Sequence, residues 1–147
     1  MSAAFRKTSH NPYSVLAEFR RRLREFLTFS EEAAHSAGLH PQQHQLILGI
    51  AGYTGRGWAT ISELAEFLQE RHNAVVGLVE RAARRGLVSK EQSSGDRRFV
   101  RVRLTPKGED LLGKLTDLHR DELVRVKARL LSAAKSRPRT LEQKEGA

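Results

Sequence analysis

The chain of 147 residues contains no cysteine. This absence excludes a disulfide framework, a cysteine-ligated metal and a thiol-based redox switch. No apolar run approaches the roughly 20 residues that a membrane-spanning helix needs, and the first residues lack the apolar core of a secretory signal. We therefore expect one cytoplasmic domain without a membrane partner, long enough to bury its own core.

Acidic residues are outnumbered by basic ones. The sequence has 26 Lys and Arg against 17 Asp and Glu, which gives a net charge of +9. Residues 71–103 alone hold nine basic and three acidic side chains, a net charge of +6 in under a quarter of the chain. A solvated surface would spread its charge more evenly. The concentration of charge favours nucleic acid or another anionic partner.

Recognisable catalytic and cofactor motifs are missing. The glycines of Gly52–Gly57 fit neither the dinucleotide fingerprint nor the P-loop, so we expect a connector there. No nucleophile, base and orienting acid stand in a recognisable setting, which argues against an enzyme. A zinc site is a weak alternative, because His40 precedes the helix-starting Pro41 and its neighbour His44 has no convincing third ligand. We expect no metal and no other cofactor.

Helical spacing of apolar residues marks both ends of the chain. Residues 14–36 carry one apolar stripe, and Leu111 to Leu130 sustain a long helix or a broken pair, with Thr105 and Pro106 as its cap and first residue. A small domain cannot cover both stripes, so we expect them to pack against a second copy. The predicted dimerisation residues are Leu16, Phe19, Leu23, Leu123, Val126 and Leu130. A monomeric core that covers the stripes is the alternative.

The middle of the chain predicts a helix-turn-helix. Pro41 can begin a short helix, and Thr60 and Glu63 are spaced as a capping box for the next one. A further helix follows and ends at Gly86. Its expected buried stripe is Val75, Leu78, Val79 and Ala82. Two short helices joined by a tight turn are typical of DNA-binding proteins.

The second of these helices would present its first turns to a major groove. The predicted groove residues are Arg71, His72, Asn73, Val76 and Gly77. Asn73 can pair with adenine, or it can merely cap the helix; His72 can equally be a solvent-facing side chain. Farther along, we expect Arg81, Arg84, Arg85 and Arg101 to contact phosphates, which sets affinity rather than sequence preference.

A β-hairpin follows the two helices. Residues 87–92 and 98–104 read as strands, and Ser93–Asp96 as the turn between them. A hairpin at this place is a wing, and Arg97 and Arg98 at its tip can enter a minor groove, where negative potential is concentrated.

These features resemble the MarR family of bacterial transcription regulators over roughly residues 14–125. The matching segments are Leu39–Gln43, Ile61–Val88, and Asp96-Arg97-Arg98 followed by Leu104–Gly108. The resemblance implies that Asp96 holds the wing in shape and that Arg98 reaches the minor groove. It also implies a dimer with interlaced terminal helices and a crevice for a small aromatic or phenolic ligand. Candidate lining residues are Tyr13, His35, His44, Tyr53 and His119, each of which packing would also explain.

Two departures from the family pattern bear on DNA recognition. Ser93-Ser94-Gly95 replaces more strongly charged residues, which predicts a shorter reach of the wing. Gly77 stands where relatives often have a larger polar or basic residue, so the preferred DNA sequence does not follow from the resemblance.

The expected fold is mainly α (α+β): a winged helix-turn-helix with N- and C-terminal helices forming a dimerisation region. We place the domain at 11–136, with the DNA-binding lobe at 38–104 and the dimerisation helices at 11–37 and 105–136; residues 1–10 and 137–147 are expected to be disordered. The expected function is a sequence-specific regulator of transcription on double-stranded DNA, acting as a ligand-responsive homodimeric repressor on a near-palindromic operator. The alternatives are an architectural DNA-binding protein and a protein-interaction adaptor.

Overall fold

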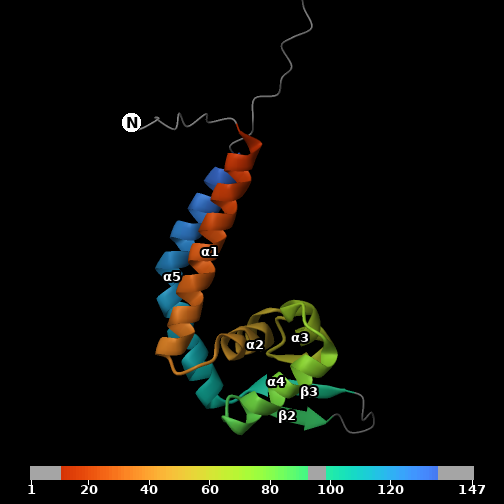
Figure 1. The fold of residues 1–147 in the computed structure, drawn as a ribbon. Coiled ribbons are helices and arrows are strands. Elements are labelled where there is room, and N and C mark those ends of the chain that lie inside the picture. Colours follow the sequence, from red (N-terminus) through yellow and green to blue (C-terminus); the bar gives the residue numbers. More distant parts are fainter. Residues whose placement is uncertain (1–10, 93–98, 136–147) are drawn as a thin grey trace, which may run out of the picture. The chain divides into compact units, whose positions relative to one another are not determined.

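The computed structural model of the protein describes residues 11–92 and 99–135. The chain divides into two compact units (Figure 1). The terminal-helix unit combines Met1–Phe29 with Arg120–Ala147, and the winged-helix unit is Ser30–His119. The expectations for residues 1–10, for the turn at 93–96 and for residues 137–147 lie outside the described residues.

The terminal-helix unit consists of the first part of α1 (Pro12–Ser36) and the last part of α5 (Pro106–Lys135). The predicted first helix is confirmed and begins slightly earlier, where the Asn11 side chain accepts a hydrogen bond from the Tyr13 backbone at 2.9 Å. The sequence left open whether the last helix is broken, and α5 is continuous. No helix among the described residues has a stretch apolar and long enough to cross a bilayer.

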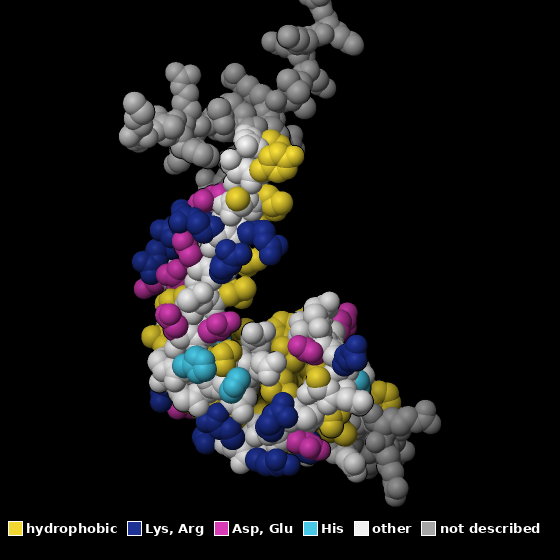
Figure 2. Space-filling model, in the orientation of Figure 1, with side chains coloured by type: hydrophobic (Ala, Val, Ile, Leu, Met, Phe, Trp, Pro, Cys, Tyr) yellow, Lys and Arg dark blue, Asp and Glu magenta, His cyan; other side chains and the backbone are white. Residues whose placement is uncertain are grey.

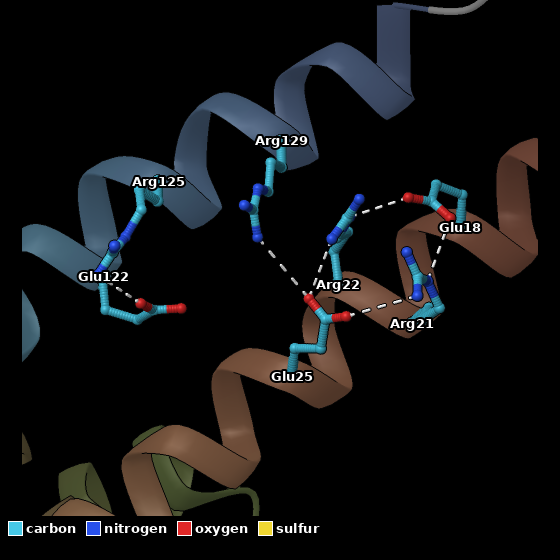
Figure 3. Close-up of polar contacts among 7 residues, drawn as sticks. All are labelled: Glu18, Arg21, Arg22, Glu25, Glu122, Arg125 and Arg129. Carbon is cyan, nitrogen blue, oxygen red and sulfur yellow. Dashed lines mark hydrogen bonds and ion pairs between the residues drawn. The ribbon is translucent and has the colours of Figure 1, made fainter.

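Charged side chains of the terminal-helix unit pair with one another (Figure 3). Arg22 donates to Glu18 at 2.9 Å and to Glu25 at 3.2 Å, and the bond to Glu25 raises the pKa of Arg22. Glu25 also lies 4.0 Å from Arg129 of α5, which links the two helices. Water and dissolved salt screen the attraction in exposed pairs of this kind. They therefore contribute little to the stability of the unit.

Three helices of the winged-helix unit surround one core. They are α2 (Pro41–Gly52), α3 (Ile61–Leu68) and α4 (His72–Arg84). The predicted inward stripe of α4 is confirmed, since all four of its residues are buried. Leu46, Ile47 and Leu64 are fully buried as well. Each such side chain contributes roughly 1.5–3 kcal/mol on burial, so this unit closes its own core.

A three-stranded antiparallel sheet completes the winged-helix unit. Its strands are β1 (Trp58–Thr60), β2 (Val88–Gln92) and β3 (Val100–Leu104), in the order β1-β3-β2. The two predicted strands are confirmed, with β2 starting at Val88 rather than residue 87 and β3 at Val100 rather than residue 98. The sequence reading missed β1, because three residues are too few to show an alternating pattern. Ala59 of β1 pairs with the buried Val102 of β3.

The ends of the helices follow the sequence signals closely. Thr60 accepts a hydrogen bond from the Glu63 backbone at 3.2 Å, as the capping-box prediction requires. Gly86 has φ +70°, the left-handed conformation expected after α4. α5 begins at Pro106, as predicted. Gly108 in its first turn lies close to Leu87, the residue before β2, because a Cβ there would lie 2.2 Å from the Leu87 carbonyl oxygen. Any larger residue would push α5 away from β2.

Candidate nucleic-acid interface

The first turns of α4 present the predicted groove residues. Arg71, His72 and Asn73 are exposed, while Val76 and Gly77 are half-buried. The capping alternative for Asn73 is wrong, because the N-cap is Arg71 and Asn73 lies inside the helix. Within the described part of the chain, the Asn73 carboxamide forms no hydrogen bond. It is therefore available to an external partner.

The arginines farther along α4 differ in their surroundings. Arg81 and Arg84 are exposed, and neither lies within ion-pair distance of a carboxylate among the residues that the structure describes. The guanidinium of Arg81 lies against Gly77, where an added Cβ would be 3.2 Å from its Nη1 atom. Figure 2 shows Lys and Arg side chains gathered where α4 and β2 lie in Figure 1.

Arg85 differs from Arg81 and Arg84 because its guanidinium forms hydrogen bonds within the chain. Its Nη1 donates to the side-chain oxygen of the buried Gln43 at 2.5 Å, and its Nη2 donates to the Gly38 carbonyl at 2.6 Å. The same Gln43 oxygen accepts from the His40 backbone at 3.1 Å. Both terminal nitrogens are thus used to tie the end of α4 to the start of α2. These bonds give Arg85 a structural role, and its phosphate contact stays a prediction.

An aromatic residue holds two arginines at the base of the wing. The guanidinium carbons of Arg56 and Arg101 lie 3.8 Å and 4.5 Å from the ring centroid of Trp58. Arg56 also pairs with Glu63, and this hydrogen bond lowers the pKa of the Glu63 carboxyl. Arg101 is exposed and has no carboxylate partner in the described ranges. The indole therefore restricts the orientation of a cation that remains available to an anion.

Sequence reasoning missed Arg56 and Trp58. The useful signal would have been β1 itself, whose pairing with β3 brings Trp58 next to Arg101 and opposite Arg103. The charge of Arg103 is instead paired with Glu91, whose Oε2 atom lies 3.3 Å from the Arg103 Nε atom. The predicted minor-groove residues Arg97 and Arg98, and the supporting Asp96, lie outside the described residues.

Two histidines and a serine, from three helices, meet inside the winged-helix unit. The rings of His44 and His119 are 5.2 Å apart, and the Nε2 atom of His119 lies 3.0 Å from the Ser30 hydroxyl. Burial lowers the pKa of His44, and the neighbouring His119 lowers it further. No group of three or more potential metal ligands occurs within residues 11–92 and 99–135. These histidines pack together.

A cavity of about 500 Å³ lies elsewhere in the winged-helix unit. Its lining comes from α2, the connector before β1, the end of β3 and the start of α5: Ala51, Gly57, Leu104, Glu109, Leu112, Gly113, Thr116 and Asp117. None of the five candidate ligand residues from the sequence is among these lining residues.

Several predicted dimerisation residues of the terminal-helix unit are exposed in the single chain. Leu16 is 60% and Leu123 is 53% exposed, and Leu23 is exposed as well. Phe19 and Leu130 are half-buried. Val126 is only 4% exposed, so it packs within its own chain. Figure 2 shows hydrophobic side chains along α1, where the exposed Tyr13 extends the stripe.

Comparison with known proteins identifies the type of domain. Residues 37–98, which include α2, β1, α3, α4 and β2, match the model of the MarR family. This segment of the chain is similar to the MarR family. No curated protein matches the chain in sequence.

Solved structures of MarR-like regulators share the fold. The M. tuberculosis transcriptional regulator MosR, solved in complex with DNA, is 28% identical with a TM-score of 0.58, over 74% of this chain and 77% of that one. AbsC, a MarR family transcriptional regulator from Streptomyces coelicolor, is 19% identical with a TM-score of 0.68, over 80% and 79%. Bordetella bronchiseptica BpsR, whose DNA binding is regulated by 6-hydroxynicotinic acid, is 18% identical with a TM-score of 0.64, over 82% and 93%.

Proposed function

We propose that this protein is a MarR family regulator: a sequence-specific, ligand-responsive repressor that acts in the cytoplasm as a homodimer on a near-palindromic operator. The exposed basic side of α4 carries the proposal. Arg71, Arg81 and Arg84 lie along it without a carboxylate partner among the described residues. Like charges gathered in this way repel one another unless an anionic partner neutralises them. Double-stranded DNA supplies that neutralisation along its whole length.

Each part of the surface has a proposed task. Arg71, His72, Asn73, Val76 and Gly77 face the major groove, where the Asn73 carboxamide can pair with an adenine edge. Arg81, Arg84 and Arg101 contact phosphates, and Trp58 positions Arg101 for this contact. Arg97 and Arg98 enter the minor groove, with Asp96 supporting the wing.

The terminal helices supply the proposed dimer. Residues 11–37 and 105–136 form the dimerisation region, and residues 38–104 form the DNA-binding lobe. The exposed leucines Leu16, Leu23 and Leu123 support this division, because contiguous apolar side chains on a helix usually meet another protein surface. A two-fold dimer presents two recognition helices to successive major grooves, which requires an inverted repeat.

A small aromatic or phenolic ligand is the proposed signal. The cavity of about 500 Å³ in the winged-helix unit is large enough for such a molecule. The regulation of BpsR by 6-hydroxynicotinic acid supports a ligand of this size and chemistry. Binding releases DNA only if the ligand prefers a spacing of the two lobes that does not fit the operator.

Selection of binding sites from random duplex DNA by the purified protein tests this proposal. An enriched inverted repeat with half-site centres about one helical turn apart supports a dimeric, sequence-specific regulator. A pool that binds without enrichment would instead indicate an architectural protein, and the absence of binding would indicate an adaptor.

Two variants add detail to the selection experiment. Arg98→Ala should weaken binding to every duplex, because the wing contact carries little base information. Asn73→Ala should cost about 1–3 kcal/mol, mainly on matched sites. Equal losses on matched and random duplexes would remove the base-reading role of Asn73.

A further inference from the structure

The side chain of Arg81 is folded back along α4. Its Nη1 and Cζ atoms would lie 3.2 Å and 4.0 Å from a Cβ atom on Gly77, one turn nearer the start of the helix. Long side chains on a helix lean toward its N-terminus, so this direction is the ordinary one. What is particular to this chain is the glycine, whose missing side chain lets the guanidinium lie close to the helix surface.

The same guanidinium borders a small cavity beside the groove-reading turns. This cavity measures about 240 Å³, and Asn73, Gly77 and Arg81 line it from α4. These three residues follow one another at intervals of four, which places them on one side of the helix. Gln42 of α2 and Glu70 before α4 also line the cavity. Arg81 and the proposed adenine reader Asn73 therefore face the same hollow.

Arg84 provides an internal comparison on the same helix. It is exposed like Arg81, but four residues before it stands Glu80 rather than a glycine. Position 80 therefore carries a side chain one turn before Arg84, whereas Gly77 leaves the helix surface one turn before Arg81 without one. The two arginines thus carry the same charge but have different access to the early turns of α4.

We propose that Arg81 reads a guanine in the major groove and that Gly77 sets its position. This inference rests on the proposed function, and it changes the role of Arg81 from a phosphate contact to a specificity-determining residue. The planar guanidinium donates two parallel hydrogen bonds to O6 and N7 of guanine, a pattern that no other base offers. Asn73 and Arg81 then read neighbouring base pairs, and Gly77 leaves the space that Arg81 needs.

Parallel selections from one random duplex library test the inference. The proteins are the wild type, Arg81→Ala, Arg81→Lys and Gly77→Ala, with Arg84→Ala as the matched control. We expect the wild type to enrich one G·C pair in each half-site that Arg81→Ala no longer enriches, with a 10- to 100-fold loss of discrimination there. Arg81→Lys keeps the charge but loses the paired donors, so it should lose discrimination at the same position.

Gly77→Ala tests the positioning role separately. The added methyl requires the guanidinium to move by a few tenths of an ångström, so preference should weaken at the same G·C pair. The thermal stability of the protein should rise, because alanine favours a helix more than glycine does. Arg84→Ala should weaken binding to all duplexes without changing the enriched sequence. An unchanged preference at that pair in Gly77→Ala would remove Gly77 from the proposal.

The outcomes separate this inference from the proposed function. If Arg81→Ala behaves like Arg84→Ala and leaves the enriched sequence intact, Arg81 contacts phosphate and the inference is overturned while the regulator remains. If the wild type itself enriches no sequence, the proposed sequence-specific function fails. Arg81→Lys guards against a folding artefact, since it preserves the length and charge of the side chain.

Discussion

The two compact units differ in what they leave uncovered. The winged-helix unit buries Leu46, Ile47 and Leu64 completely and leaves cations such as Arg84 without a carboxylate partner in the described residues. The terminal-helix unit pairs Arg22 with two glutamates but leaves Leu16 and Leu123 exposed. Uncompensated charge indicates an anionic partner, and uncovered apolar surface indicates a protein partner. The two units therefore indicate two different partners, an anion for the winged-helix unit and a protein surface for the terminal-helix unit.

Truncating a leucine to alanine should show the largest difference in stability between the two units. Leu64→Ala in the closed core should lower the free energy of unfolding by about 2–5 kcal/mol, because it leaves a cavity that cannot collapse fully. Urea denaturation measures this loss. Leu123→Ala should have a smaller effect that depends on protein concentration, since the contact that it removes lies between copies. Equal, concentration-independent losses would contradict the distinction.

A charge on the apolar stripe should dissociate the dimer. Leu16→Glu places a carboxylate in the proposed interface, and we expect the dimer dissociation constant to rise on the order of 100-fold, about 2.7 kcal/mol. Sedimentation equilibrium measures the change. Leu48→Glu is the control, because Leu48 is an exposed leucine of the winged-helix unit. Self-association that resists Leu16→Glu would place the interface elsewhere.

Removing the stacking of Arg101 on Trp58 should weaken DNA binding without changing the net charge of the protein. Trp58→Leu removes the ring that orients Arg101, so affinity should fall about two- to fivefold, equivalent to roughly 0.5–1 kcal/mol. The slope of log affinity against log salt should stay the same, whereas Arg101→Ala should reduce its steepness by about 0.9. Fluorescence anisotropy with a labelled duplex measures both. A reduced slope in Trp58→Leu would mean that a phosphate contact, not its orientation, was lost.

Lowering the pH should reduce the stability of the winged-helix unit, and this is the smallest effect that we expect. Burial and His119 lower the pKa of His44, so the unfolded chain takes up a proton more readily than the folded chain. Stability is therefore complete above the unfolded histidine pKa of about 6.5 and falls as the pH decreases below it. Urea midpoints between pH 8 and pH 5 should show this decline, and His44→Gln should flatten it. An identical decline in both proteins would assign it to other groups.

Local signals in the sequence were sufficient for most elements of the fold. The inward stripe of α4 follows from apolar spacing, and the start of α5 follows from Thr105 and Pro106, because these patterns depend only on nearby residues. The strand β1 depends on pairing with β3, far away in the sequence, so its three residues carry no periodic signal of their own.

The site was less predictable because tertiary contacts decide what each arginine does. Arg81, Arg84 and Arg85 look equivalent in the sequence, yet Arg85 is tied to Gln43 and Gly38, and Arg81 lies over Gly77. The stack of Arg101 on Trp58 likewise requires the sheet. The roles of Asp96, Arg97 and Arg98 remain predictions.

The most direct test of the account changes the spacing of the DNA and leaves the protein intact. The wild-type protein is titrated with its selected duplex and with the same duplex lengthened by about five base pairs at the centre, roughly half a helical turn. A dimer with two recognition helices can no longer place both in major grooves on one side of the DNA. We predict that affinity falls to that of a single half-site. Equal affinity for both duplexes would contradict the central claim that two copies read an inverted repeat together.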